Sequence, residues 1–393
     1  MPGRTKLSEP SVTIIPTKTA QNSSEERWHP KRPRLLTVLF SILALIAVVH
    51  FIAVAHQSEV VVSPNTCTGL LQTTDYTQQV HLQPQAQEMG AVQMVNQLAG
   101  GQPAALVTVN NGDAQHSLDI YIYGCTSRQN TLHLNVLFMQ RSLPEGTVSM
   151  SASNTLIIGQ LDTNLTAQAA VLVQPLQQNI YREYRWFHGT FVQAIFPSLY
   201  PVTSRSEAEA LQQQVNNGQT LPWSDPLTTA EQMAKDIFKW PASSPQDSVL
   251  DNNGTTATVQ LVQQNPALQV TVTLERLVQR DTRGLWFVTA ATSSGITFTQ
   301  PETGAAITSP ATVTGTGALA DGQLTATFFD HTLTSLTILN TPTLPVDTGG
   351  AFTGSLFYTN NAHNQPGLLL IQSLPPTGST EAGKLVLVKV ILD

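Results

Sequence analysis

The sequence predicts a mainly β protein with an α+β middle, in which one N-terminal transmembrane helix precedes a β-rich ectodomain that ends in a β-sandwich. Two patterns carry this prediction. One uncharged apolar run covers residues 35–55, and from residue 105 onward short apolar segments alternate with turn residues. Only 11% of the residues are charged, and Gln, Asn, Thr and Ser separate the β-branched residues, a composition that suits exported β-rich proteins. The chain after the run is long enough for two or three domains of ordinary size.

Residues 35–55 divide the chain into two sides. A helix of this length extends about 31 Å, which matches the hydrocarbon thickness of a bilayer. A buried helix of a soluble domain is disfavoured because no polar stripe recurs at helical spacing. Basic residues precede the run as far as Arg34, and the next one is Arg128. Short basic segments stay in the cytoplasm, so we expect a single-pass anchor in the cell membrane, with a cytoplasmic N-terminus and an extracytoplasmic C-terminal domain. A signal peptide cleaved after Ala55 is the alternative, although the run is long for one.

Residues 1–34 are predicted to be a disordered cytoplasmic tail, because they show no periodic apolar spacing. The tail is net positive and suits anionic lipid, whereas the remainder of the chain has an excess of Asp and Glu. An acidic ectodomain argues against nucleic acid as a partner. The expected partners are therefore the membrane and a cell-envelope protein or wall component.

Cys67 and Cys125 are the only cysteines in the sequence, and both lie on the predicted oxidising side of the membrane. We expect a disulfide between them, and in the chain-entropy model a loop of this length stabilises the fold by about 4 kcal/mol. The histidines form neither an HExxH motif nor a pair at ligand spacing. The sequence therefore predicts no metal site and no cofactor.

Residues 56–200 are predicted to form a β-rich exported domain. We expect a helix at 85–98 and strands at 105–110, 118–124, 131–139, 154–160 and 169–173. The segment 181–196 predicts a hairpin around His188-Gly189, because Gly adopts the positive φ that a tight turn needs. Tyr184, Trp186 and Phe191 of this hairpin are a candidate binding surface. The alternative is that these aromatic side chains pack on the next sheet layer.

Residues 201–300 are predicted to form a small α+β domain. A helix is expected at 206–215, and Asp225-Pro226 opens a second one, because Asp caps free amides and Pro costs no hydrogen bond in the first turn. Apolar residues then repeat on one face until Pro241. This helix needs a sheet to cover, and strands are expected at 255–263, 268–279 and 285–298.

Residues 301–393 show no helical pattern. Strands are expected at 307–317, 324–331, 333–339, 351–358, 367–373 and 384–392. The stretch AAITSPATVTGTG at 305–317, followed by LTATFFDH, GAFTGSLFYTN, PGLLLIQS and KLVLVKVIL, resembles the immunoglobulin-like domain of bacterial spore germination proteins. The Ser-Pro-x-x-V-x-G opening of that family corresponds here to Ser309-Pro310, Val313 and Gly315. The resemblance implies an immunoglobulin-like β-sandwich that faces the cell envelope and has no catalytic residues. GLWFVTAATSSGITF at 284–298 resembles the segment that often precedes this domain in exported bacterial proteins.

The motifs of common enzyme classes are missing from the sequence, since no GxSxG, P-loop or GxGxxG occurs. Asp330 and His331 are adjacent on a predicted strand and would point to opposite faces. We therefore expect no enzymatic activity and interpret the chain as a membrane-anchored envelope binding or scaffolding protein. The resemblance implies sporulation or germination as its setting. One alternative is an extracytoplasmic sensor of a wall fragment or small solute, with a pocket lined by Tyr184 and Trp186. The other is a hydrolase whose carboxylates, or Ser and His, converge in a cleft.

Overall fold

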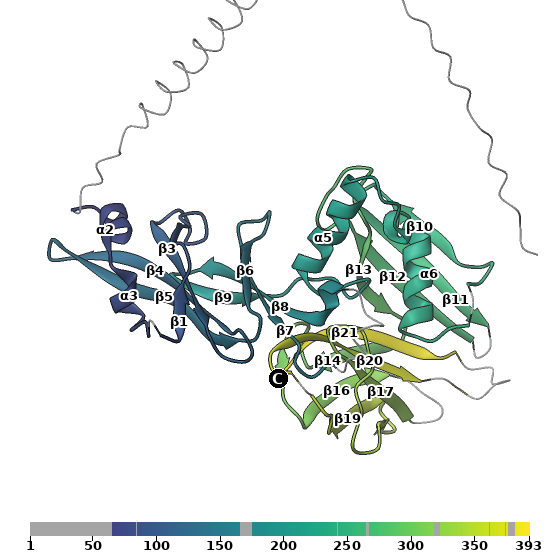
Figure 1. Ribbon diagram of the computed structural model, residues 1–393. Coiled ribbons are helices and arrows are strands. Elements are labelled where there is room, and N and C mark those ends of the chain that lie inside the picture. The colour runs from purple at the N-terminus through teal and green to yellow at the C-terminus, as the bar shows by residue number, and fades with distance from the viewer. Residues whose placement is uncertain are drawn as a thin grey trace, which may run out of the picture. The chain divides into compact units, whose positions relative to one another are not determined.

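The structure is a computed structural model, and it describes residues 65–393 except for 84, 166–174, 242, 265–266, 318–322, 361, 374 and 376–381. The predicted tail at 1–34, the predicted membrane segment at 35–55 and the predicted strand at 169–173 lie outside the described residues. The fold is mainly β, with 47% strand, 13% helix and several antiparallel sheets, which confirms the β-rich prediction (Figure 1). No helix in the described part of the chain is both long and apolar enough to cross a membrane.

Two short helices lie on one face of a five-stranded sheet in the N-terminal part. The sheet has the order β1-β3-β4-β5, and β2 also pairs with β3. Leu71 and Tyr76 from the helices pack against Val107, Tyr121 and Tyr123 of the sheet. The elements are α2 (Cys67–Thr73), α3 (Tyr76–Gln79), β1 (Gln87–Met89), β2 (Gln93–Met94), β3 (Ala104–Asn111), β4 (Leu118–Arg128) and β5 (Thr131–Leu143).

A disulfide links the helical layer to the sheet. The sulfur of Cys67 in α2 is bonded to that of Cys125 in β4, and 58 positions of sequence separate the two residues. The bond closes a loop that contains α2, α3 and β1 to β3. It therefore holds both helices against the sheet that they cover.

The predicted helix at 85–98 is wrong. β1 and β2 occupy this segment, and each pairs antiparallel with β3. The amide of Gly90 between them donates to the carbonyl of Thr108 at 2.9 Å, and a side chain at position 90 would collide with the Thr108 hydroxyl. The apolar residues of this segment recur at helical spacing, but strand pairing with β3 determines their conformation. Tertiary contacts here outweigh the weak local preference for a helix.

A second, four-stranded sheet of order β6-β7-β8-β9 packs on the opposite face of the first sheet. The shared core contains Leu106, Ile120 and Ile122 from the first sheet with Leu156 and Ile158 from the second. Sheet packs on sheet here, with the inward residues of both forming one core. The elements are β6 (Thr147–Met150), β7 (Leu156–Leu161), the 3₁₀ helix η1 (Pro175–Gln178), β8 (Asn179–Phe187) and β9 (Thr190–Ala194).

The predicted hairpin at 181–196 is confirmed. β8 and β9 pair up to Phe187 and Thr190, which leaves His188 and Gly189 as a two-residue turn. Their φ values are 48° and 87°. Positive φ at both positions defines the turn type that matches the twist of the flanking strands.

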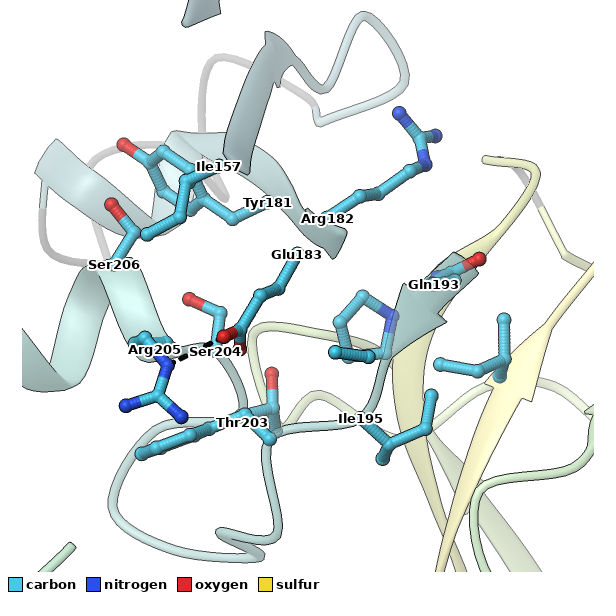
Figure 2. Close-up of a pocket in the computed structure, with 14 residues that line it drawn as sticks. Ile157, Tyr181, Arg182, Glu183, Gln193, Ile195, Thr203, Ser204, Arg205 and Ser206 are labelled. Carbon is cyan, nitrogen blue, oxygen red and sulfur yellow. Dashed lines mark hydrogen bonds and ion pairs between the residues drawn. The ribbon is translucent and has the colours of Figure 1, made fainter. Parts of the chain in front are cut away.

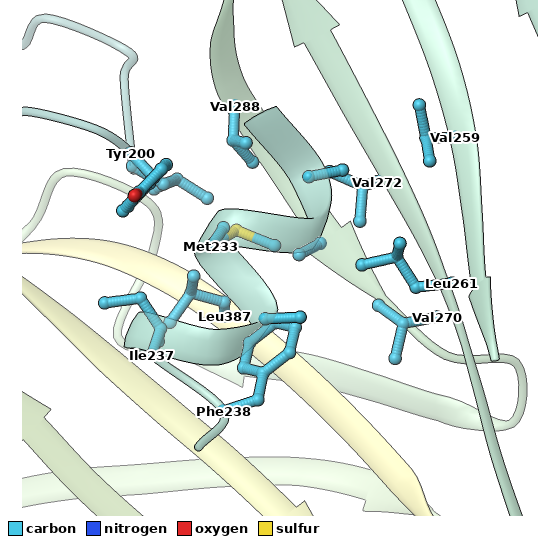
Figure 3. Packing of buried hydrophobic residues seen from close by; sticks show 14 of the residues in the cluster. Tyr200, Met233, Ile237, Phe238, Val259, Leu261, Val270, Val272, Val288 and Leu387 are labelled. Atoms are coloured by element: carbon cyan, nitrogen blue, oxygen red, sulfur yellow. The ribbon is translucent and has the colours of Figure 1, made fainter. Parts of the chain in front are cut away.

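Helices α5 (Arg205–Asn216) and α6 (Pro226–Asp236) open the C-terminal part, as the sequence predicts. The carboxylate of Asp225 accepts a hydrogen bond from the amide of Thr228 at 2.8 Å, which caps α6. Met233 of α6 and Ile237 and Phe238 just after it lie over the sheet strands that carry Val259 and Val272, and Figure 3 shows how these side chains meet. The helix therefore covers the sheet that its apolar face requires.

One continuous sheet contains strands from both sides of residue 300. Its order is β10-β11-β12-β13-β21-β20-β17-β18, and β15 pairs in parallel with β21. The link is the pairing of β13 with β21, at Ala291 with Leu387 and at Thr292 with Val386. The strands are β10 (Ser248–Asn252), β11 (Thr256–Gln264), β12 (Ala267–Glu275), β13 (Phe287–Thr292), β15 (Ala306–Ile307), β17 (Gln323–Phe329), β18 (Thr343–Pro345), β20 (Gln365–Ser373) and β21 (Lys384–Leu392).

A small sheet of order β14-β16-β19 shares a core with one end of this long sheet. Val313 and Phe352 from the small sheet meet Phe328, Leu369 and Val390 from the long one. The last part of the chain is therefore a β-sandwich that shares one of its sheets with the α+β layer. The division of the chain at residue 300 stays a prediction. The strands of the small sheet are β14 (Ile296–Gln300), β16 (Ala311–Gly317) and β19 (Ala351–Leu356).

Two predicted strands differ from the structure. The strand expected at 285–298 is split, because the chain turns at Gly295, whose φ is 76°, and β14 then joins the small sheet. Residues 333–339 form no strand. The carboxylate of Asp330 accepts hydrogen bonds from the amides of Thr332 and Thr334 at 2.9 and 3.0 Å, and such local bonds compete with strand pairing.

Replacing both cysteines with serine should lower the free energy of unfolding by about 4 kcal/mol, because a loop of this length gains that much freedom in the unfolded chain. Denaturant unfolding of the full chain, with and without reductant, measures the difference. Reductant should destabilise the wild type and leave the double variant unchanged. Equal stability of the oxidised wild type and the double variant would contradict the prediction.

Candidate functional site

The three aromatic residues singled out from the sequence lie together at the core between the two N-terminal sheets. The ring of Phe138 in β5 packs edge-on against Tyr184 and Phe191, with ring centres 4.8 and 5.5 Å apart, and Trp186 packs against Phe191 at 5.1 Å. Tyr184 is 7% exposed, and its hydroxyl accepts a hydrogen bond from Gln140 at 2.8 Å. The rings fill the space between sheet layers, and their use as a binding surface stays a prediction.

A cluster of buried polar side chains, which the sequence did not predict, lies where β8, α5, β20 and β21 come together. We call it the polar junction. Each member is at most 6% exposed. Its members are Ser198, Thr203, Ser204, Glu207, His331 and Lys389.

Lys389 is the buried cation of the polar junction. It lies in β21, and its Nζ donates hydrogen bonds to the carbonyls of Ser198 and Thr203 at 2.8 and 2.7 Å. Burial lowers the pKa of Lys389 to about 7, and the attraction of Glu207 opposes this shift. The side chain thus ties the segment before α5 to the centre of the long sheet.

Glu207 is the buried anion of the polar junction, and it belongs to the first turn of α5. Its Oε2 accepts hydrogen bonds from the hydroxyl and the amide of Ser204 at 2.6 and 3.2 Å, while its own amide donates to the Ser204 hydroxyl. This is a capping box, in which each residue satisfies a free amide of the other. Burial raises the pKa of the Glu207 carboxyl, against the Ser204 hydrogen bond and the charges of His331 and Lys389.

Two arginines lie beside the polar junction and connect the same elements. Arg182 in β8 is 6% exposed and donates to the carbonyls of His363 and Asn364 at 2.7 and 2.9 Å and to the side chain of Gln160 at 2.8 Å. Arg205 at the start of α5 pairs with Glu183 of β8 at 2.7 Å. Charged hydrogen bonds of this kind are short and directional, so they fix the position of β8 relative to α5 and to the loop before β20.

The cavity between these elements is small (Figure 2). Its walls include Tyr181, Glu183, Thr203, Ser204 and Arg205. The volume that the centres of water molecules could occupy is about 20 Å³. The Glu183 Oε2 atom is buried and has no hydrogen-bond partner among the described residues. A volume of this size holds one or two water molecules, and a water there would satisfy the carboxylate. The cavity has no room for a substrate.

A larger groove, of about 340 Å³, runs beside α6. Ala234, Trp240 and Pro241 supply apolar surface, and Glu231 and Asp247 supply carboxylates. Burial and the charge of Asp247 raise the pKa of Glu231. The size is that of a small-molecule site.

In comparisons with known proteins, no family model, no curated protein and no solved structure matches the chain. Within the described residues, no group of three or more His, Cys, Asp or Glu side chains is placed to hold a metal ion. The polar junction left two signals in the sequence. Lys389 stands inside the apolar run of the last strand, and Ser204 with Glu207 has capping-box spacing.

Replacing Lys389 with methionine should remove a pH dependence of stability. The folded protein releases the lysine proton near pH 7 and the unfolded chain near the ordinary value of 10.5, so the unfolded state binds more protons between these values. The free energy of unfolding of the wild type therefore rises with pH over this window, by up to about 1.4 kcal/mol per pH unit. Denaturant unfolding of the full chain at several pH values measures the slope.

The matched control is Lys384→Met in the same strand, because the Lys384 amine bonds a carbonyl at the surface. Its slope should equal that of the wild type. Identical slopes in Lys389→Met and the wild type would show that Lys389 keeps an ordinary proton affinity.

Proposed function

We propose that the chain is a non-catalytic, single-pass membrane protein whose β-rich ectodomain binds or scaffolds a component of the cell envelope. In this proposal the C-terminal sandwich is an immunoglobulin-like domain. Its partner is an envelope protein or a wall component, and the resemblance at 305–317 makes sporulation or germination the setting.

The observation that carries the proposal is the bond between Cys67 and Cys125. Both residues follow the apolar run at 35–55, whose basic flank lies entirely on its N-terminal side. Disulfides persist in oxidising compartments and are rare in the cytosol. A disulfide on the C-terminal side of the run supports an ectodomain outside the membrane.

The C-terminal sandwich supports the immunoglobulin-like assignment. Two sheets enclose one core, and β16 with its Ser309-Pro310 entry pairs with β19 in the small sheet. A sandwich of this kind presents its loops and strand edges as contact surface. This support comes from the fold, and the same fold serves many functions.

The polar junction supports a non-catalytic role. Lys389 donates to backbone carbonyls, Glu207 takes part in a helix cap, and the cavity beside them has room only for water. A catalytic pair needs a substrate within hydrogen-bond reach. The described geometry uses these groups to hold elements together.

The groove beside α6 favours one second candidate, an extracytoplasmic sensor of a small solute. Its carboxylates suit a ligand with an amine or several hydroxyls. Calorimetric titration of the full chain with soluble wall fragments tests this function. Binding that is lost in Glu231→Gln and kept in Glu275→Gln would establish the sensor, whereas absence of heat with every fragment would remove it.

The membrane topology is tested with the full chain carrying an N-terminal tag in bacterial cells. We expect the tag to stay in the membrane fraction, and a membrane-impermeant maleimide to label Cys67 and Cys125 in intact cells only after reductant is added outside. The double serine variant is the control and should never be labelled. Labelling without reductant, or a mature N-terminus at His56, would contradict the anchored topology.

The binding role is tested by crosslinking in intact cells, followed by purification through the tag and identification of proteins and wall glycan. The control chain carries residues 1–64 fused to an unrelated exported domain. A defined envelope component that is enriched over the control supports the proposal. Equal recovery of the same envelope components from the full chain and the control chain would contradict the proposed binding role.

A further inference from the structure

The turn between β10 and β11 carries the sequence Asn253-Gly254-Thr255. An asparagine followed by any residue except proline and then by serine or threonine is the acceptor pattern of N-linked glycosylation. β10 ends at Asn252 and β11 begins at Thr256, so the pattern lies at the tip of a hairpin. All three of its residues are exposed. The pattern is therefore placed where an enzyme can reach it.

Hydrogen bonds bring the two recognised side chains of the pattern together. Oδ1 of Asn253 accepts hydrogen bonds from the hydroxyl and the amide of Thr255, both at 3.0 Å, and from the amide of Thr256 at 2.8 Å. The φ of Gly254 is 90°, a value that glycine adopts without strain, and it lets the chain turn this tightly. The carboxamide of Asn253 and the hydroxyl of Thr255 are thus neighbours on one exposed turn.

Asp251 adds a charged group to the pattern. It stands two positions before Asn253 and is exposed. Bacterial acceptor sequences carry an acidic residue at this position, in addition to the asparagine and the hydroxyl. A carboxylate there can accept a charged hydrogen bond from an arginine of the transferase, and such a bond is stronger than a neutral one. Residues 251–255 therefore match the longer, bacterial form of the acceptor.

Two other segments of the sequence match the shorter pattern. Asn164-Leu165-Thr166 follows an acid, Asp162, but Thr166 lies outside the described residues. Asn22-Ser23-Ser24 belongs to the predicted cytoplasmic tail, and Ala20 stands where the acid would be. Asn253 is thus the asparagine for which the acid, the hydroxyl and an exposed turn are all described.

The strand that leads to Asn253 gives a glycan something to cover. β10 forms one edge of the long sheet and pairs with β11 alone among the described strands (Figure 1). Val249 and Leu250 on this edge are 40% and 55% exposed. An edge strand with apolar side chains is a template on which another chain can pair. A glycan is bulky and solubilising, so one attached at the end of β10 would block this edge.

We propose that Asn253 is an N-glycosylation site and that its sugar donor is an oligosaccharide linked to a lipid diphosphate. In the transfer, Nδ2 of Asn253 bonds to the first carbon of the sugar, and the bond from that carbon to the diphosphate oxygen breaks. The diphosphate leaves with the bonding electrons, and Nδ2 loses one proton to a base of the transferase. The inference rests on the membrane topology proposed above, because such transferases act on the exported side.

The acceptor is tested on the purified full chain in detergent, with a purified bacterial oligosaccharyltransferase and its lipid-linked donor. Mass spectrometry of the peptide that contains residue 253 should show a gain of one glycan. Thr255→Ala and Asp251→Asn should lose this gain, whereas Thr255→Ser keeps the hydroxyl and should keep the glycan. An unmodified peptide in the wild type, or equal modification of the wild type and Thr255→Ala, would overturn the proposal.

The modified residue is assigned with two neighbouring asparagines of the same turn. Asn253→Gln should lose the glycan. Asn252→Gln is the matched control, because it leaves the pattern intact, and it should be modified as the wild type is. A glycan that persists in Asn253→Gln would overturn the proposal.

The same chain in bacterial cells that carry the transferase and its donor separates this inference from the proposed topology. We expect the peptide with residue 253 to be glycosylated in these cells as well. Glycosylation in detergent and none in cells would support the acceptor and contradict the exported topology. Absence of the glycan in both settings would overturn the acceptor itself, whatever the maleimide labelling shows about topology.

Discussion

The hydrogen bonds from the buried amine of Lys389 to two backbone carbonyls determine how the chain enters its C-terminal part. Removing a charged group from water costs several kcal/mol, so the amine must find partners, and it finds them in Ser198 and Thr203. These bonds fix the segment that precedes α5. The helix then starts where Ser204 and Glu207 cap each other, with Glu207 close enough to interact with the lysine charge. The amine of Lys389 thus holds the residues that lead into α5.

Each cluster of buried apolar residues lies within one part of the molecule, and charged and polar side chains form the hydrogen bonds between the parts. In the N-terminal part, sheet-on-sheet packing and the helical layer bury the apolar residues. In the C-terminal part, α6 and the small sheet cover the long sheet. Between the parts lie Arg182, the Arg205–Glu183 pair and His331. Hydrogen bonds require defined distances and angles, so they specify an arrangement more sharply than apolar contact does.

These constraints bear on function. The aromatic side chains of the β8–β9 hairpin serve the core between sheets, and the polar junction serves attachment, so neither leaves an open reactive site in the described residues. The groove beside α6 is the open concave surface described above. The disulfide between Cys67 and Cys125 holds the helical layer in place beside them.

The sequence by itself determined the mainly β class, the hairpin turn at His188-Gly189, the start of α6 at Asp225-Pro226 and the strand at 384–392, because turn residues, caps and long apolar alternation act locally. It misassigned residues 85–98 and 333–339, where pairing with β3 and the Asp330 turn prevail over spacing. Tertiary structure alone decided that β13 pairs with β21 across residue 300, and that Lys389, Glu207 and His331 meet. Those residues come from distant segments, and burial creates the need for partners only once the sheets have assembled.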